Sequence, residues 1–166
     1  MECCFNYRGV CKILTIKDCS NLLKELERVG IKAFTPSENR KIRCRGKWHT
    51  QNVLIFSGYV FIDIEKYSPE LFHKIHRLTG FIRFLGSPPS PLSATESEQI
   101  RWLCNGGNPI EVSYYRLENG KAKFIDGVVF RLQHLITNFN LRQHRVKLRL
   151  TINGRSFNVS LPVEKI

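Results

Sequence analysis

The sequence predicts an α+β protein in two parts, an N-terminal antiparallel sheet with helices on one face and a small C-terminal β-barrel. Up to residue 104 the strand and helix patterns follow the order β-α-β-β-α-β-α. Beyond residue 115 no helical period remains, and short strand patterns follow one another. The stretch 53–64 is apolar on both faces of a strand, so another layer of the chain or a partner must cover its second face.

The first part of the chain has strand and helix patterns with defined ends. Strands are expected at residues 10–16, 31–34, 53–64 and 80–86. Helices are expected from residue 18 or 20 to about 29, and at residues 69–78 and 93–104. Gly30 ends the first helix, while Ser93 and Glu96 have the spacing of a capping box at the start of the last one.

A basic segment at residues 37–52 interrupts this order, as an exposed loop or a mobile hairpin. Lys and Arg side chains neutralise phosphates, and an aromatic ring can stack on an unpaired base. We therefore predict a nucleic-acid contact here, for an RNA hairpin or an exposed DNA strand; the alternative is a solvated surface segment without a ligand. The candidate residues are Arg40, Lys41, Arg43, Arg45, Lys47 and Trp48.

The second part of the chain reads as five short strands, and a closed barrel would remove their exposed edges. The strands are expected at residues 122–125, 128–132, 135–139, 145–151 and 155–161. Turns are expected at 117–120 and at Asn153-Gly154. The sequence therefore predicts an N-terminal domain over residues 1–112, a linker over 113–119 and a barrel over 120–166.

Length and charge limit the function classes. A chain of 166 residues makes one domain or two small ones. The 26 Lys and Arg exceed the 14 Asp and Glu by 12, which indicates an acidic partner, more often nucleic acid than an anionic membrane. No apolar run approaches the roughly 20 residues that span a bilayer, and the N-terminus does not read as a signal peptide. A cytoplasmic protein without a membrane partner is expected.

Chemistry-bearing motifs are missing from the sequence. The six cysteines form no C-x-x-C pair, and the histidines do not complete a zinc spacing, so free and mostly buried thiols are favoured over a metal site. There is no Gly-rich phosphate loop and no G-x-S-x-G. We therefore expect no catalytic residues, no cofactor and no metal, although residues distant in sequence could still assemble a site.

Several runs of residues resemble the NusG-type transcription elongation factors. Ile55-Phe-Ser-Gly-Tyr-Val-Phe-Ile62 resembles the L-F-P-G-Y-V-F-V strand of their N-terminal (NGN) domain, and the 80–86 run followed by Pro91-Leu-Ser93 resembles the next part of it. Lys123-Phe-Ile-Asp-Gly127 and the strands after it resemble the KOW domain, an SH3-like barrel. The basic insert and the run 30–36 resemble the specialised LoaP-like paralogues, which act as antiterminators. The resemblance covers nearly the whole chain from about residue 9.

The sequence departs from the family pattern at a few places. Val10-Cys11 stands where an aromatic pair usually opens the first strand, and the T-G-x-E that follows is absent. Ser57 replaces the usual proline before Gly58, and His134 stands in place of the second glycine of the KOW motif.

The resemblance implies a non-enzymatic, monomeric factor that suppresses pausing and termination. Its sheet would bind the clamp helices of RNA polymerase, with Tyr59 and Phe61 matching the Tyr and Phe of the family strand and Phe56 assigned to the same site. Alternatively these rings pack under the barrel or a loop. A different functional class is a ribosomal-type KOW protein that binds RNA without polymerase.

Overall fold

The computed structural model describes residues 7–13, 16–64, 68–85 and 90–166. The chain divides into two compact units. The first comprises Met1–Thr35 and Phe56–Ser97, and the second comprises Pro36–Ile55 and Glu98–Ile166. The basic segment therefore belongs to the same unit as the C-terminal strands, although it lies within the N-terminal half of the sequence.

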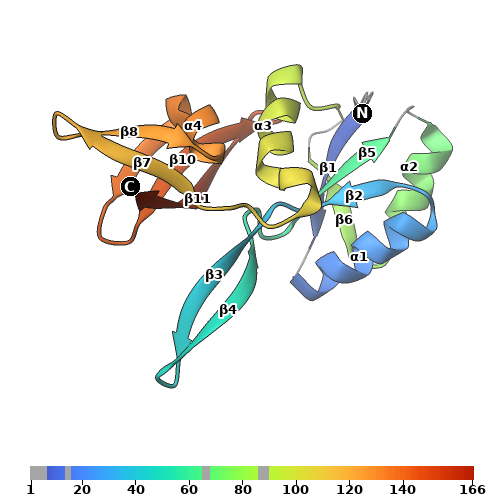
Figure 1. The fold of residues 1–166 in the computed structure, drawn as a ribbon. Coiled ribbons are helices and arrows are strands. Elements are labelled where there is room, and N and C mark those ends of the chain that lie inside the picture. The colour runs from blue at the N-terminus through green and yellow to red at the C-terminus, as the bar shows by residue number, and fades with distance from the viewer. Residues whose placement is uncertain (1–6, 14–15, 65–67, 86–89) are drawn as a thin grey trace. The chain divides into compact units, whose positions relative to one another are not determined.

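The first unit is a four-stranded antiparallel sheet with helices packed against it (Figure 1). The strand order is β2-β5-β1-β6, formed by β1 (Tyr7–Ile13), β2 (Lys32–Phe34), β5 (Tyr59–Ile64) and β6 (Phe81–Phe84). Helices α1 (Ile16–Arg28) and α2 (Pro69–His76) bury apolar faces, and the ring of Phe72 lies 4.6 Å from that of Phe84. The predicted antiparallel sheet with helices is confirmed.

The expected strand 53–64 is in fact two strands joined by a turn. Strand β4 (Lys47–Leu54) ends before it, and β5 begins only at Tyr59. Gly58 has φ +86°, which continues no strand, and Tyr59 N donates to the carbonyl of Phe56 at 3.2 Å. The turn resets the alternation of side chains, so that Phe56 contacts Phe61 although strand parity places them on opposite faces.

The basic segment forms the hairpin that was one of the two expectations. Strand β3 (Ser37–Cys44) pairs with β4 along its whole length, in antiparallel register. The two-residue loop Arg45-Gly46 has φ of 50° and 80°, as a type I′ turn requires at both positions. The twist of such a turn matches that of the flanking strands, so the pairing continues to the tip.

A curled five-stranded sheet forms most of the second unit (Figure 1). Its order is β8-β7-β11-β10-β9, from β7 (Ser113–Glu118), β8 (Lys121–Asp126), β9 (Ile136–Asn140), β10 (Arg145–Ile152) and β11 (Arg155–Lys165). Along β10 every second residue is buried, from Val146 to Ile152, so one face of the strand makes the core. This sheet fits the predicted small barrel, and Asn153-Gly154 forms the predicted turn with positive φ at both residues.

One predicted barrel strand is wrong. Residues 128–132 start with the short helix α4 (Val128–Arg131), followed by the 3-10 helix η2 (Gln133–Leu135). Val129 and Leu132 are both fully buried at helical spacing, and a short apolar run does not distinguish a strand from a helical turn. The fifth strand is instead β7, which lies in the segment expected to be a linker.

Helix α3 (Ala94–Cys104) starts with the predicted capping box. The amide of Glu96 donates to Ser93 Oγ at 3.2 Å, and the amide of Ser93 donates to a carboxylate oxygen of Glu96 at 2.8 Å. Two of the helix's otherwise unpaired amides are thereby satisfied, which explains why the helix begins at this point.

Gly127 sits where only glycine fits, so replacing it should destabilise the second unit strongly. Its φ is +86° and ψ −175°, and an added Cβ would lie 2.7 Å from the Cα of Ser113. We expect Gly127→Ala to lower the free energy of unfolding by about 3 kcal/mol or more, as measured by urea titration.

Gly154→Ala is the matched control for this experiment. Its φ is also positive, at +72°, but an added Cβ would meet no atom of the described residues within 4 Å. Only the backbone cost of about 1–2 kcal/mol should remain. Equal losses in the two variants would contradict the close packing of Gly127 on Ser113.

Candidate functional site

Positive charge is concentrated in the second unit. This unit contains 16 Lys and Arg and 6 Asp and Glu, a net charge of +10, whereas the first contains 10 and 8, a net charge of +2. Dividing the chain at one point in the sequence hides this difference, because the basic hairpin is then counted with the wrong unit. An acidic partner is therefore expected at the second unit.

The hairpin distributes its basic residues over two faces. In the register of β3 and β4, Arg43 pairs with Trp48 and Lys41 pairs with Thr50, so these four side chains share one face. Trp48 is 68% exposed. The opposite face has Arg40 and Lys47, and Arg45 lies in the turn at the tip. An exposed indole beside two cations is an arrangement suited to a base with its phosphates.

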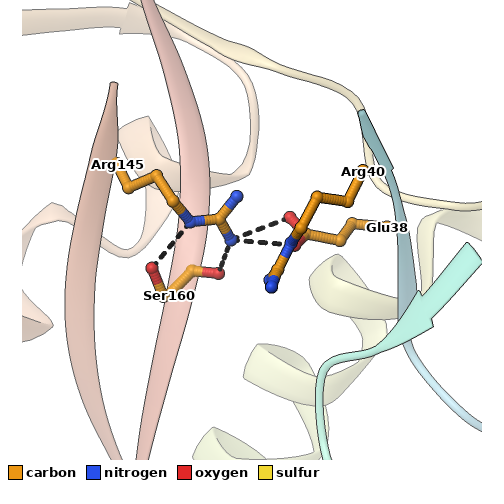
Figure 2. A network of polar contacts seen from close by, with 4 residues as sticks. All are labelled: Glu38, Arg40, Arg145 and Ser160. Atoms are coloured by element: carbon orange, nitrogen blue, oxygen red, sulfur yellow. Dashed lines mark hydrogen bonds and ion pairs between the residues drawn. The ribbon is translucent and has the colours of Figure 1, made fainter. Parts of the chain in front are cut away.

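A buried carboxylate, Glu38, joins the base of the hairpin to the C-terminal sheet (Figure 2). It is 2% exposed and accepts hydrogen bonds from Arg145 Nη2 at 2.8 and 3.0 Å and from Arg40 Nε at 2.7 Å. Arg145 Nε also donates to Ser160 Oγ at 2.8 Å, and its Nη2 donates to the Ser160 carbonyl. Of the predicted nucleic-acid residues, Arg40 is thus already paired with Glu38, although its side chain remains 42% exposed.

Sequence reasoning did not find that Glu38 pairs with Arg145, which is 107 positions away. One signal was present in the sequence: Glu38 is the single acidic residue in the basic segment 37–52. A lone carboxylate among cations is a candidate for a structural ion pair, but nothing in the sequence identifies Arg145 as its partner.

The second unit also contains a groove of about 810 Å³ between the hairpin and the C-terminal strands. The hairpin contributes the side of the groove that contains Trp48 and Lys41. On the other side lie Arg145, the first residue of β10, and His144 just before it. The remaining lining residues are Asn39, Arg40, His49, Thr50, Val112, Gln143, Pro162, Val163 and Glu164.

The residues predicted to bind polymerase lie together in the first unit, but they differ in exposure. The Phe61 ring is 1% exposed; it stacks on Phe34 at 6.0 Å and meets Phe56 edge-on at 5.4 Å. Phe56 is 3% exposed, whereas Tyr59 is partly exposed. Tyr59 is therefore the member of the set whose side chain a partner can reach directly.

Three cysteines have described side chains, and none of the three belongs to a disulfide. Cys19 is buried, and burial raises the pKa of its thiol, an effect opposed by a side-chain hydrogen bond with Thr35. Cys44 is exposed and Cys104 partly exposed, so the expectation of mostly buried thiols fits only Cys19 of the three. Cys3 and Cys4 lie outside the described residues.

Metal clusters and membrane-spanning helices are both absent from the described part of the chain. No group of three or more His, Cys, Asp or Glu side chains there is placed to hold a metal ion. No helix in the same residues has both the length and the apolar composition that crossing a bilayer requires.

Comparisons with known proteins add a family and a fold. Residues 16–101 match the family model described as "Transcription termination factor nusG". The solved structure titled "Domain interaction in Thermotoga maritima NusG" is similar with a TM-score of 0.55 and 20% sequence identity, over 94% of this chain and 93% of that one. A search of the curated proteins found no match.

Removing Arg145 should leave the Glu38 carboxylate buried with Arg40 alone. We expect Arg145→Leu to lower the free energy of unfolding by about 3 kcal/mol, since breaking a buried pair leaves a poorly compensated charge. Adding Glu38→Gln to that variant should restore part of the loss. Urea titration of the two single variants and the double variant measures this coupling.

Arg149→Leu is the control for the ion pair, because Arg149 is exposed on the same strand. Its replacement should change stability by no more than about 0.5 kcal/mol. If Arg145→Leu costs no more than this control, the ion pair does not hold the hairpin on the sheet.

Proposed function

The chain belongs to the NusG family of transcription factors, and from this we propose that it binds elongating RNA polymerase and nucleic acid and suppresses pausing and termination. The observation that supports the nucleic-acid part is the net charge of +10 on the second unit, with an exposed Trp48 on its basic hairpin. Lys41, Arg43, Arg45 and Lys47 would contact phosphates, while Arg40 would act mainly through Glu38.

The polymerase part of the proposal rests on the family and on the β5 region. We propose that Tyr59 contacts the clamp helices, with Phe56 and Phe61 supporting it from the core of the first unit. The protein would act as a cytoplasmic monomer, without catalysis or a cofactor. The basic hairpin favours a specialised antiterminator of the LoaP type, recruited by a nucleic-acid signal.

The alternative is a ribosomal-type RNA-binding protein, which the basic curled sheet also suits. A pull-down with purified core polymerase, with and without RNA, separates the two functions. Retention of polymerase in the absence of RNA supports the proposal. Retention of RNA alone favours the ribosomal-type alternative.

Replacing Tyr59 should weaken polymerase binding without unfolding the protein. Tyr59→Ala should cost on the order of 2 kcal/mol in binding, roughly 30-fold in Kd, if the ring is buried at the interface. Val29→Ala is the control, because Val29 is an exposed apolar residue of the same unit, 39% exposed after α1. If Tyr59→Ala and Val29→Ala bind polymerase with equal affinity, Tyr59 does not lie at the interface.

Phe61→Ala should behave differently from Tyr59→Ala. Because its ring is buried between Phe34 and Phe56, truncation should cost about 3–5 kcal/mol of stability. A loss of polymerase binding in Phe61→Ala therefore does not show that Phe61 contacts polymerase, unless thermal unfolding shows that the variant is still folded.

The basic hairpin should make RNA binding steeply dependent on salt. Replacing Lys41, Arg43 and Lys47 by Gln should lower the slope of log K against log salt by roughly 2–3, at about 0.7–0.9 for each lost phosphate contact. Trp48→Ala should instead weaken binding by about 1–3 kcal/mol with little change in slope. Filter binding of a short RNA hairpin at several salt concentrations measures both quantities.

A charge-matched control lies in the first unit. Lys24, Lys74 and Arg77 are exposed residues there, and replacing them by Gln removes the same charge from the protein. The slope should then stay near that of the unmodified protein. Similar slopes for the two triple variants would mean that net charge, and not the hairpin, attracts RNA.

A further inference from the structure

We propose that the groove between the hairpin and the C-terminal strands seats an unpaired nucleotide of RNA, with its base stacked on Trp48, so that hairpin and barrel bind the strand together. This inference rests on the proposed nucleic-acid function and deepens it. In this arrangement the barrel residues His144 and Gln143 contact the same nucleotide as Trp48, whereas a hairpin acting alone would bind RNA without them.

The base of the hairpin is bonded to the rest of the second unit at successive residues. Ile110 N donates to the Ser37 carbonyl at 2.7 Å, and Glu38 forms a parallel bridge with Ile110. The side chain of Glu38 then bonds Arg145 at the start of β10. A hairpin held at its base by backbone and side-chain bonds keeps one orientation, so the groove beside it is preformed.

The groove has the size and the lining that a nucleotide requires. Its volume of about 810 Å³ lies within the range of roughly 300–1,000 Å³ typical of ligand pockets. Trp48 lines it with 68% of its surface exposed, and its ring makes no aromatic contact with the described residues. An indole that is both exposed and free of ring partners is available for stacking.

The polar groups around Trp48 favour an unpaired base over a duplex. Lys41 can neutralise a phosphate, while the amide of Gln143 can both donate and accept hydrogen bonds at a base edge. In a stacked duplex the faces of the bases are covered, so only an unpaired base can reach the indole. Thr50 and His144 add groups able to bond a 2′-hydroxyl, which is why we assign RNA; Glu164 is the acidic residue of the lining.

A double-mutant cycle across the groove tests the inference. Trp48→Ala should weaken binding of an RNA hairpin with an unpaired loop by about 5- to 150-fold. His144→Asn should also weaken it, by several-fold, and the two effects should combine to less than their product because both side chains contact one nucleotide. Asn is used because His144 has φ +52°, a conformation that Asn adopts readily.

Two control variants have the same chemical changes outside the groove. Phe130→Ala removes an aromatic ring that is 45% exposed on the same unit, and His134→Asn removes an exposed imidazole. Both should leave the Kd unchanged. A fully paired RNA and a DNA hairpin of the same sequence serve as competitors, and each should compete several-fold less well.

Fluorescence gives a second readout that reports on stacking itself. The chain has two tryptophans, and Trp102 Nε1 is buried without an acceptor among the described residues, so Trp102→Phe removes no hydrogen bond there. In that variant the emission comes from Trp48 alone. Adding the RNA hairpin should quench it, and His144→Asn should shift the quenching to higher RNA concentration.

The outcomes distinguish a failure of this inference from a failure of the proposed nucleic-acid function. Variants of the basic hairpin could weaken RNA binding while His144→Asn does not, or the effects of Trp48→Ala and His144→Asn could multiply in full. In either case RNA binds the basic hairpin alone, and the inference about the groove is wrong. If the fully paired RNA competes as well as the RNA hairpin, the groove does not require an unpaired base. If the DNA hairpin competes as well, the assignment to RNA is wrong. If the unmodified protein binds no RNA at any salt concentration, the proposed nucleic-acid function fails as well.

Discussion

The ion pair between Glu38 and Arg145 is the contact on which the arrangement of the second unit depends. It joins residues 107 positions apart, and Glu38 is 2% exposed. A buried carboxylate is costly unless it is paired and hydrogen-bonded, so the base of the hairpin is stable where the guanidinium groups of Arg145 and Arg40 meet Glu38. The fork of Arg145 also bonds Ser160 on β11, which extends the network to a second strand of the sheet.

This attachment has an electrostatic cost and a functional consequence. Bringing the five cations of the hairpin onto a sheet that is itself basic gives one body with a net charge of +10. Like charges repel one another in the folded state, and polyanion binding relieves that repulsion. Glu38 neutralises charge at the point where hairpin and sheet meet, while the exposed cations toward the hairpin tip stay available to phosphates.

Local patterns predicted most of the fold, and long-range contacts account for what they missed. The capping box at Ser93, the turn at Asn153-Gly154 and the period of two along β10 depend on neighbouring residues, and all were readable. The break in the stretch 53–64 was missed although Ser57-Gly58 marks it, because apolar residues flank this pair on both sides. Helix α4 was missed because four residues are too few for a period. The partner of Glu38 is set by tertiary packing, which a single sequence does not record.

The same limit explains why the two aromatic candidates differ in the structure. The sequence treats Phe61 and Trp48 both as surface candidates, Phe61 through its match to the family strand and Trp48 through its basic neighbours. Phe61 is buried because the turn at 55–58 returns Phe56 onto it and β2 brings Phe34 alongside. Among the described residues Trp48 has no aromatic neighbour, and its cross-strand partner is Arg43. A large apolar ring left exposed between cations has no role in the core, and its surroundings suit a ligand that offers both a flat ring and negative charge.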